Sequence, residues 1–399
     1  MKKIALFIFL VGLVTLSWAD EPRRFFELGF DVNLSASNNY IGLTDIMKET
    51  IVIDLDKISK DLSSSGFRVA ADAGADFFLN LNLGKKLRLG FFTNVQASGF
   101  GSLPGSLFEL LAEGNEIDKE YKGDLLMWGD LNLEMGAKVG TKIGPLQVMF
   151  KPVYYMPLIH LYNPKAYYSF ETKSDGTIVA KGIAEIPIYS VIPLDSLENS
   201  INVGGATGNL FASGGLDLSL SADYSLFPFL TVGGTLTQLP IVPARMENRS
   251  LLKANFTFET VSILDGIGKD SGDMYTSTDS SDFVYDTKKI MFVRPIKIGA
   301  HAEYRPFGRL LSVTPNLGLG YYNTLFMEFG VEGRLNLANI LILSLSTNFE
   351  DLVWKEQLGL ILNFRIVELE VMVGSYSPGF IKSFTGAGLG ASVGMKFGF

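Results

Sequence analysis

The feature that most constrains this chain is a polar–apolar alternation with a period of two, which runs through long segments of the sequence. After Gly215, for example, apolar residues alternate with aspartate and serine as far as Tyr224. Because successive residues of a strand point to opposite faces, each such segment predicts a strand with one apolar and one polar face. Further segments of this kind occur at 75–83, 131–139, 327–337 and 367–373. Strands are also expected at 290–305 and 310–322.

The length of these segments favours a membrane protein. Strands of soluble sheets usually have about five or six residues, whereas about ten are needed to cross a membrane at a tilt. In lipid every backbone N–H and C=O group needs a partner, and a closed sheet supplies one to every strand. The pattern therefore predicts an all-β fold, a membrane-spanning antiparallel up-and-down β-barrel. A helical membrane protein is excluded, because no apolar stretch of roughly 18 residues follows residue 19.

The predicted connections differ in length at the two ends of the strands. Tight turns are expected at 84–85, 142–144, 226–228, 306–308 and 338–339, and the long excursions at 35–66, 100–124, 158–206 and 243–289 fall at the opposite end. Bacterial outer-membrane barrels have this asymmetry, with short periplasmic turns and long extracellular loops. The path contains about 14 strands if residues 167–190 form a hairpin in an outer loop, and about 16 if that hairpin belongs to the barrel.

The first residues predict export. A basic start is followed by an apolar run from Ile4 to Leu16, and Ser17-Trp18-Ala19 places small residues where a signal peptidase reads. We therefore expect a signal peptide at 1–19 and a single barrel at 20–399.

Composition removes other classes of protein. The chain has no cysteine, which excludes a disulfide scaffold and thiolate metal or nucleophile sites. Its net charge of −8 argues against nucleic acid as a partner, because phosphate binding needs a clustered basic surface. With 47% hydrophobic residues the chain is too apolar to be disordered.

The last predicted strand carries a more specific pattern. Its apolar residues alternate with small or basic ones, and it ends on an aromatic: Val393, Met395, Phe397 and Phe399. This resembles the C-terminal signal of bacterial outer-membrane proteins, which the barrel assembly machinery recognises. The resemblance implies the bacterial outer membrane as location, with its lipids and the assembly machinery as partners.

The whole chain also resembles the FadL-like long-chain fatty acid transporters, including their diverged spirochaetal relatives. The features that carry this resemblance are the signal peptide, the mature length, the strand number and an apolar segment in an outer loop. In that family an N-terminal hatch plugs the barrel and often carries an Asn-Pro-Ala motif. Residues 20–45 lack the triplet, and 26–34 read as a strand instead.

Two outer segments have helical spacing. In 100–124 the apolar residues recur every three or four positions, and by analogy with the family they are candidates for substrate capture: Leu103, Leu107, Phe108, Leu110 and Leu111. A short helix packing its apolar side on the rim would show the same stripe. In 45–62 the spacing suits either a helix that plugs or caps the barrel or a strand, so 35–66 is a possible plug or cap segment.

Charged residues on the predicted polar faces are the candidate lumen lining: Asp72, Asp76, Glu134, Glu303, Glu328, Glu332 and Arg334. They would suit an ion-selective pore, but any water-filled barrel has a polar lining.

Catalytic, metal and cofactor sites are not predicted. His160, placed in a loop, and His301, on a polar strand face, belong to no hydrolase or zinc motif. The acidic residues Asp270, Asp273, Asp279 and Asp282 lack the spacing of a calcium loop and indicate a solvated loop. The sequence thus predicts a non-enzymatic outer-membrane protein for uptake of long-chain fatty acids or other hydrophobic small molecules. A general diffusion porin and a surface adhesin that displays its loops are the alternatives.

Overall fold

The computed structural model describes residues 24–42, 54–62, 66–84, 86–191, 193, 211–262, 275–322 and 324–399. The predicted signal peptide at 1–19 lies outside these residues. Among the helices that are described, not one combines the length and apolarity of a membrane span.

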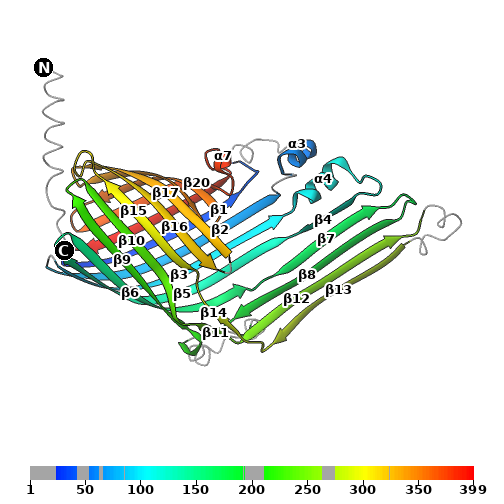
Figure 1. Ribbon diagram of the computed structural model, residues 1–399, viewed down its shortest axis with the longest axis horizontal. Coiled ribbons are helices and arrows are strands. Elements are labelled where there is room, and N and C mark those ends of the chain that lie inside the picture. Colours follow the sequence, from blue (N-terminus) through cyan, green and yellow to red (C-terminus); the bar gives the residue numbers. More distant parts are fainter. Residues whose placement is uncertain are drawn as a thin grey trace, which may run out of the picture.

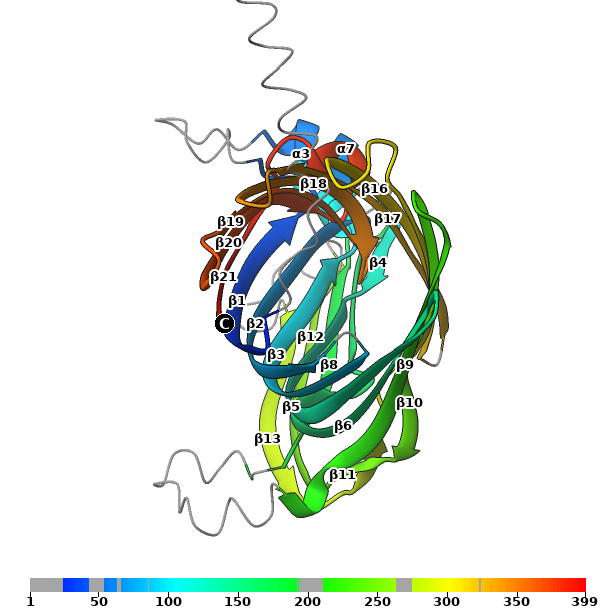
Figure 2. The ribbon, with the colours of Figure 1, turned by 90° about the vertical axis from the view of Figure 1, so that its left-hand side faces the viewer.

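The architecture is a closed antiparallel barrel of 14 strands with additional strands beyond one end (Figure 1). The barrel strands are β1 (Phe26–Asn38), β2 (Phe67–Leu83), β3 (Leu87–Leu103), β5 (Leu126–Ile143), β6 (Leu146–Leu161), β9 (Gly215–Phe227), β10 (Leu230–Val242), β15 (Ile296–Tyr304), β16 (Leu311–Tyr322), β17 (Thr324–Leu337), β18 (Leu341–Glu350), β19 (Val353–Asn363), β20 (Val367–Ser377) and β21 (Gly388–Gly398). β1 pairs with both β2 and β21, which closes the sheet. Figure 2 shows the barrel from the end at which β21 finishes.

The predicted alternation sets the two faces of the wall. On β1 the side chains of Phe30, Val32 and Leu34 are exposed on the outside, and similar rows follow on β3, β18 and β20. The residues between them point into the barrel. A continuous band of exposed apolar side chains is stable only in lipid, so the surface is that of a membrane-spanning barrel.

The short connections confirm the predicted turns at one end of the barrel. Between β17 and β18, Ala338 and Asn339 both have a φ of 57°, the left-handed conformation that two-residue hairpins require. The side-chain oxygen of Asn336 accepts the Asn339 N–H at 2.9 Å, which stabilises the turn. The described parts of the long excursions lie at the other end, which we call the outer end (Figure 1).

Five strands extend the wall beyond the outer end as an antiparallel sheet, which we call the wing (Figure 1). Its order is β4 (Glu120–Asp124), β7 (Lys165–Thr172), β8 (Ile178–Ser190), β12 (Asn248–Thr260) and β13 (Tyr275–Asp286). β8 also pairs with the last residues of β6, at Ile159, His160 and Leu161, so the wing continues the barrel wall. The hairpin at 167–190 therefore lies outside the barrel, which decides for 14 strands.

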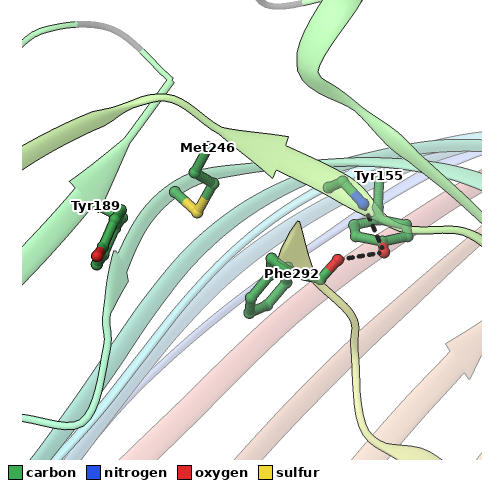
Figure 3. Close-up of a cluster of buried hydrophobic side chains, with 5 residues drawn as sticks. Tyr155, Tyr189, Met246 and Phe292 are labelled. Atoms are coloured by element: carbon green, nitrogen blue, oxygen red, sulfur yellow. Dashed lines mark hydrogen bonds between the residues drawn. The ribbon is translucent and has the colours of Figure 1, made fainter. Parts of the chain in front are cut away.

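A two-stranded ribbon lies on the inner side of the wall where the wing begins. It consists of β11 (Ala244–Met246) and β14 (Ile290–Phe292). Its residues form the main buried cluster together with Tyr155 of β6 and Tyr189 of β8 (Figure 3). The Tyr155 hydroxyl donates to the Phe292 carbonyl at 3.0 Å and accepts the Ala244 N–H at 3.3 Å, so it anchors both ribbon strands.

Several sequence predictions are wrong in detail. The strand expected at 290–305 breaks at 293–295, because Pro295 lacks an N–H group and the chain turns inward there. The excursions at 158–206 and 243–289 contain the wing strands, and Asp279 and Asp282 belong to β13 rather than to a loop. His160 is a buried residue of β6, 2.6 Å from Asp130 Oδ1. Asp270 and Asp273 lie outside the described residues.

Of the helices that the structure describes, α3 (Leu55–Leu62), α4 (Gly105–Glu113) and α7 (Phe380–Ser383) lie at the outer end. α4 begins after Pro104, whose fixed φ suits a helix start, and ends where the Gly114 N–H bonds to the Leu110 carbonyl. In α3 the Asp54 side chain caps the N-terminus by accepting the Lys57 N–H. The strand that the sequence indicated at 26–34 is a wall strand that continues to Asn38, and α3 is a helix at the rim.

Candidate functional site

An apolar pocket of about 600 Å³ lies at the outer end of β21, β1, β2 and β3. We call it the rim pocket. No charged residue lines it: the lining is Ala36, Ser37, Asn38, Ile41, Phe67, Val69, Ala70, Ala71, Gly99, Phe100, Gly101, Gly386, Ala387, Gly388 and Leu389. Sequence reasoning missed this site, since its residues are mostly small and come from four separate parts of the chain.

The strand register explains why the wall is hollow here. On the outward face Ala36 pairs with Ala71, and Ala71 pairs with Gly99, so three neighbouring strands carry small residues at the same height. The next row, which faces inward, aligns Ser37, Ala70 and Phe100. Because both rows line the pocket, little more than backbone separates the outer surface from the lumen at this place.

The lumen side of the rim pocket is apolar too. Phe100 packs on a buried cluster of Ala70, Val353 and Tyr376. Val353 and Tyr376 come from β19 and β20, so the cluster joins two separate parts of the wall. The Tyr376 hydroxyl accepts a hydrogen bond from the Gln357 side chain, which fixes the ring in position.

The predicted capture residues lie beside this pocket. Leu103 pairs with Phe67 at the end of β3, and the Phe67 ring meets Phe108 of α4 edge-on, with 6.3 Å between centroids. Leu107 and Leu110 are half-buried, and Leu111 is 58% exposed. α3 lies against α4, where Ser59 Oγ is 3.4 Å from Glu113 Oε1. Of the five residues, Leu103 and Phe108 therefore contact the pocket lining through Phe67.

Charge pairs fasten the segment that follows α4. Lys119 Nζ lies 2.6 Å from Glu109 Oε1 and 3.3 Å from Glu116 Oε1. The hydrogen bond that Lys119 donates to Glu109 is the main reason that the pKa of Lys119 is raised. Burial raises the pKa of Tyr168, whose hydroxyl lies 2.7 Å from Ser106 Oγ. These contacts hold α4 against the first strands of the wing.

Inside the barrel, Arg294 forms a buried ion-pair network. Its guanidinium binds Asp217 of β9, with Nε 2.8 Å from Oδ2, and also bonds to Glu134 of β5. The guanidinium carbon lies 4.6 Å from the centre of the Tyr155 ring. Arg294 is only 5% exposed, so the two carboxylates satisfy it in place of water. The network ties the 293–295 link to two wall strands and narrows the lumen.

The sequence pointed to Glu134 but not to its partners. The alternation indicates Asp217 only as one residue of a strand, and it predicts a continuous strand at Arg294, where the structure has none. The signal that could have found Arg294 is an arginine in an otherwise apolar run next to proline.

The other predicted lumen residues fall in two groups. Asp72 lies 3.5 Å from Ser35 Oγ, and Asp76 pairs in register with Asp31 and Asn94. Glu328 binds Lys297 at 2.6 Å. Glu303, Glu332 and Arg334 line a polar pocket of about 500 Å³ at the turn end, together with His301, Asp223 and Arg305.

Charges in the turn-end pocket are locally paired. Arg334 Nε lies 2.7 Å from Glu332 Oε1, and Arg305 Nη2 lies 2.6 Å from Glu303 Oε2. His301 Nε2 lies 3.0 Å from Asp223 Oδ1. In this pocket Glu303, Glu332 and Asp223 thus each have a cationic or imidazole partner, and the pocket is not a ring of one charge. No cluster of metal-ligating side chains is found among the described residues.

The C-terminal pattern lies on the outward face of the last strand. Val393, Met395, Phe397 and Phe399 are all exposed there. Their role as an assembly signal stays a prediction.

Comparisons with known proteins give structural neighbours only. No family model matches the sequence, and no curated protein matches it. The toluene transporter TodX of Pseudomonas putida is similar in structure with a TM-score of 0.47 and 10% identity, over 97% of this chain and 92% of that one. The Ralstonia pickettii toluene transporter TbuX gives 0.45 and 7%, with the same coverage. A FadL homologue of Pseudomonas aeruginosa gives 0.43 and 8%, again over 97% and 92%. These neighbours include the group that the sequence resembles.

Proposed function

We propose that this chain is an outer-membrane transport protein for hydrophobic small molecules, with long-chain fatty acids as the first candidates. The observation that carries the proposal is the rim pocket: an uncharged cavity at the outer end whose two sides are the lipid-facing surface and the lumen. Its volume of about 600 Å³ lies in the range of small-molecule sites, which are mostly apolar.

The position of the pocket suits capture from outside. α4 presents the exposed Leu111 at the same rim, and Phe108 links the helix to the pocket through Phe67. An apolar ligand that contacts α4 would move into the pocket without crossing a charged surface. On the lumen side it meets Phe100 and Tyr376, which continue the apolar path.

The lumen fits a transporter better than a general diffusion porin. The ribbon and the Arg294 network fill part of its cross-section beside β5, β6 and β9, whereas a diffusion porin needs a water-filled channel. Beyond the network the turn-end pocket is polar, which favours release of an apolar molecule rather than its retention.

The test fills the pocket and leaves the rest of the wall unchanged. Ala71→Leu places a larger side chain in the pocket, and Ala73→Leu makes the same change two residues along the same face of β2, outside the lining. We expect purified Ala71→Leu protein to bind a fluorescent fatty acid at least tenfold more weakly, and Ala73→Leu to bind it normally. Toluene, named for two of the structural neighbours, is the second probe.

A second pair of variants tests the helix. Leu107→Asp and Leu111→Asp should slow uptake by whole cells while leaving the barrel folded. If neither probe binds the unchanged protein, and planar bilayers show a large open conductance, the proposal is wrong and the porin alternative is favoured. Recognition of the last strand by the barrel assembly machinery is a further part of the proposal, tested by the yield of folded barrel from Phe399→Ala.

A further inference from the structure

The wing is an amphipathic sheet whose two faces differ sharply. One face carries Tyr168, Ile186, Leu252, Phe256, Phe258 and Phe283, which the strand register places side by side on β7, β8, β12 and β13. The opposite face carries most of the charges, at Lys181, Glu185, Lys253 and Glu259, together with Asn255 and the apolar Ile183 and Leu251. On the apolar face the one charged residue of these strands is Asp279 of β13, beside Phe256. A sheet with water on both sides has no reason to sort its residues in this way, so the apolar face indicates a partner.

Part of the apolar face is already covered. Over β4 and β7, α4 packs on it: Tyr121 is fully buried, and Ser106 reaches Tyr168. Over β12 and β13 the same face is open, with Phe256 46% and Phe283 40% exposed.

The apolar face is continuous with the outward surface of the barrel. Where β8 joins β6, Ile188 pairs with the outward-facing Leu161, and every second residue of β8 from Ile188 toward Ile178 lies on that side. The face therefore points sideways, parallel to the membrane plane, while the wing rises beyond the barrel (Figure 1).

The sideways orientation of the apolar face favours a second copy of this chain as its partner. Copies of one membrane protein share the same orientation, so a two-fold axis along the membrane normal can bring two outward-facing wings together. The open face measures about 600 Å², from three strands about 4.8 Å apart and 13 residues at about 3.3 Å each. A standard interface needs about 800 Å² per partner, and the lipid-facing wall below the wing can supply the rest.

We propose that the chain forms a dimer in which the apolar faces of two wings pack against each other, with β8 and β12 at the centre. The charged faces then point to solvent on both sides, and Asp279 on β13 lies at the edge of the contact. The inference does not depend on the transported molecule.

The absence of native cysteine makes a direct test possible, because one introduced thiol has no competitor. Ala184→Cys, Gly182→Cys and Ala254→Cys lie on the apolar face, and Glu185→Cys and Asn255→Cys are the matched positions on the charged face. In intact outer membranes a bismaleimide should link the first group to dimers at least fivefold more than the second.

A second measurement guards against chance collisions. Phe256→Glu should convert the detergent-extracted protein from dimer to monomer by light scattering, whereas Asn255→Glu should not. Equal cross-linking from both faces, or an unchanged protein that is monomeric in detergent and in membranes, overturns the proposal. Fatty acid binding by the Phe256→Glu monomer shows separately whether the transport proposal stands.

Discussion

The guanidinium of Arg294 holds the carboxylate of Asp217 from two nitrogens, with Nε 2.8 Å and Nη2 2.5 Å from the same Oδ2. Asp217 is only 1% exposed, so neither group has much access to water. Removing one partner of such a pair leaves the other as a single buried charge, which is far less favourable than the intact pair. The ion pair therefore matters to stability chiefly through the cost of breaking it.

Arg294→Met should therefore strongly destabilise the barrel. The variant leaves Glu134 and Asp217 buried without a cation, and breaking a buried pair costs about 3–5 kcal/mol. The temperature at which the folded band disappears in electrophoresis should fall clearly, and single-channel conductance should rise as the ribbon loosens. Lys181→Met, on the exposed face of the wing, is the control. An unchanged transition would mean that the network contributes nothing to stability.

Gly66→Ala should release α3 from the rim. Gly66 has a φ of 67°, and an added Cβ would run into the Leu103 carbonyl oxygen. Gly84 has nearly the same φ, but a Cβ added there would meet no atom within 4 Å. Gly84→Ala is therefore the control that has the backbone strain without the steric clash. We expect trypsin to cut at Lys57 and Lys60 much faster in Gly66→Ala than in Gly84→Ala. Equal rates would show that the clash is relieved without moving the helix.

Phe67→Ala should weaken ligand binding more than Phe77→Ala does. Both residues lie on the outward side of β2, but only Phe67 lines the rim pocket and touches Phe108. Phe67→Ala removes an apolar part of the pocket wall, so we expect a loss of about three- to tenfold in fatty acid affinity, which corresponds to roughly 0.6–1.4 kcal/mol of lost apolar contact. Fluorescence titration of both variants provides the measurement. A larger effect at Phe77 would place the binding site elsewhere on the wall.

The outer hairpin of the wing should loosen in acid. Asp286 binds Arg249 through Nε at 3.0 Å, and this hydrogen bond holds the pKa of the Asp286 carboxyl below its usual range. A depressed pKa contributes stability that is complete above the unfolded value of about 3.9 and is lost as the pH falls through the lower folded value.

Hydrogen exchange of the β12–β13 amides, corrected for intrinsic rates, should thus show protection that decreases below about pH 4. The Asp286→Asn variant serves as the reference, since its protection should be lower at neutral pH and should not change over this window. The same acid response in both proteins would exclude the ion pair as its cause.

The alternation was enough to predict the barrel, because lipid outside and water inside force every wall strand to obey it. It failed where a segment leaves the wall. Phe292 and Arg294 alternate with their neighbours as a wall strand would, yet they turn into the lumen, since the contacts that hold them come from β5, β6 and β9. Those partners are more than a hundred residues away for Tyr155 and Glu134, and no local pattern reports them.

The candidate site was predicted in part for a related reason. The spacing of Leu107 and Leu110 indicates a helix whatever surrounds it, so α4 could be found. The rim pocket could not, because Ala36, Ala71 and Gly99 are unremarkable until the register of β1, β2 and β3 aligns them. A pocket that results from small side chains on neighbouring strands has no recognisable pattern in the sequence.

The seam between β1 and β21 joins the two ends of the described chain. The Phe26 and Phe399 backbones exchange two hydrogen bonds of 3.2 Å, and their rings stack with centroids 5.7 Å apart. Loop-closure entropy grows only logarithmically, by about 0.6 kcal/mol for each doubling of length, so uniting such distant residues costs little more than closing a much shorter loop. The difficulty in closing the barrel lies in the order in which the strands become available for pairing. β1 must keep one edge unsatisfied until β21 arrives, and the chain therefore has a long interval in which a neighbouring strand could take that place.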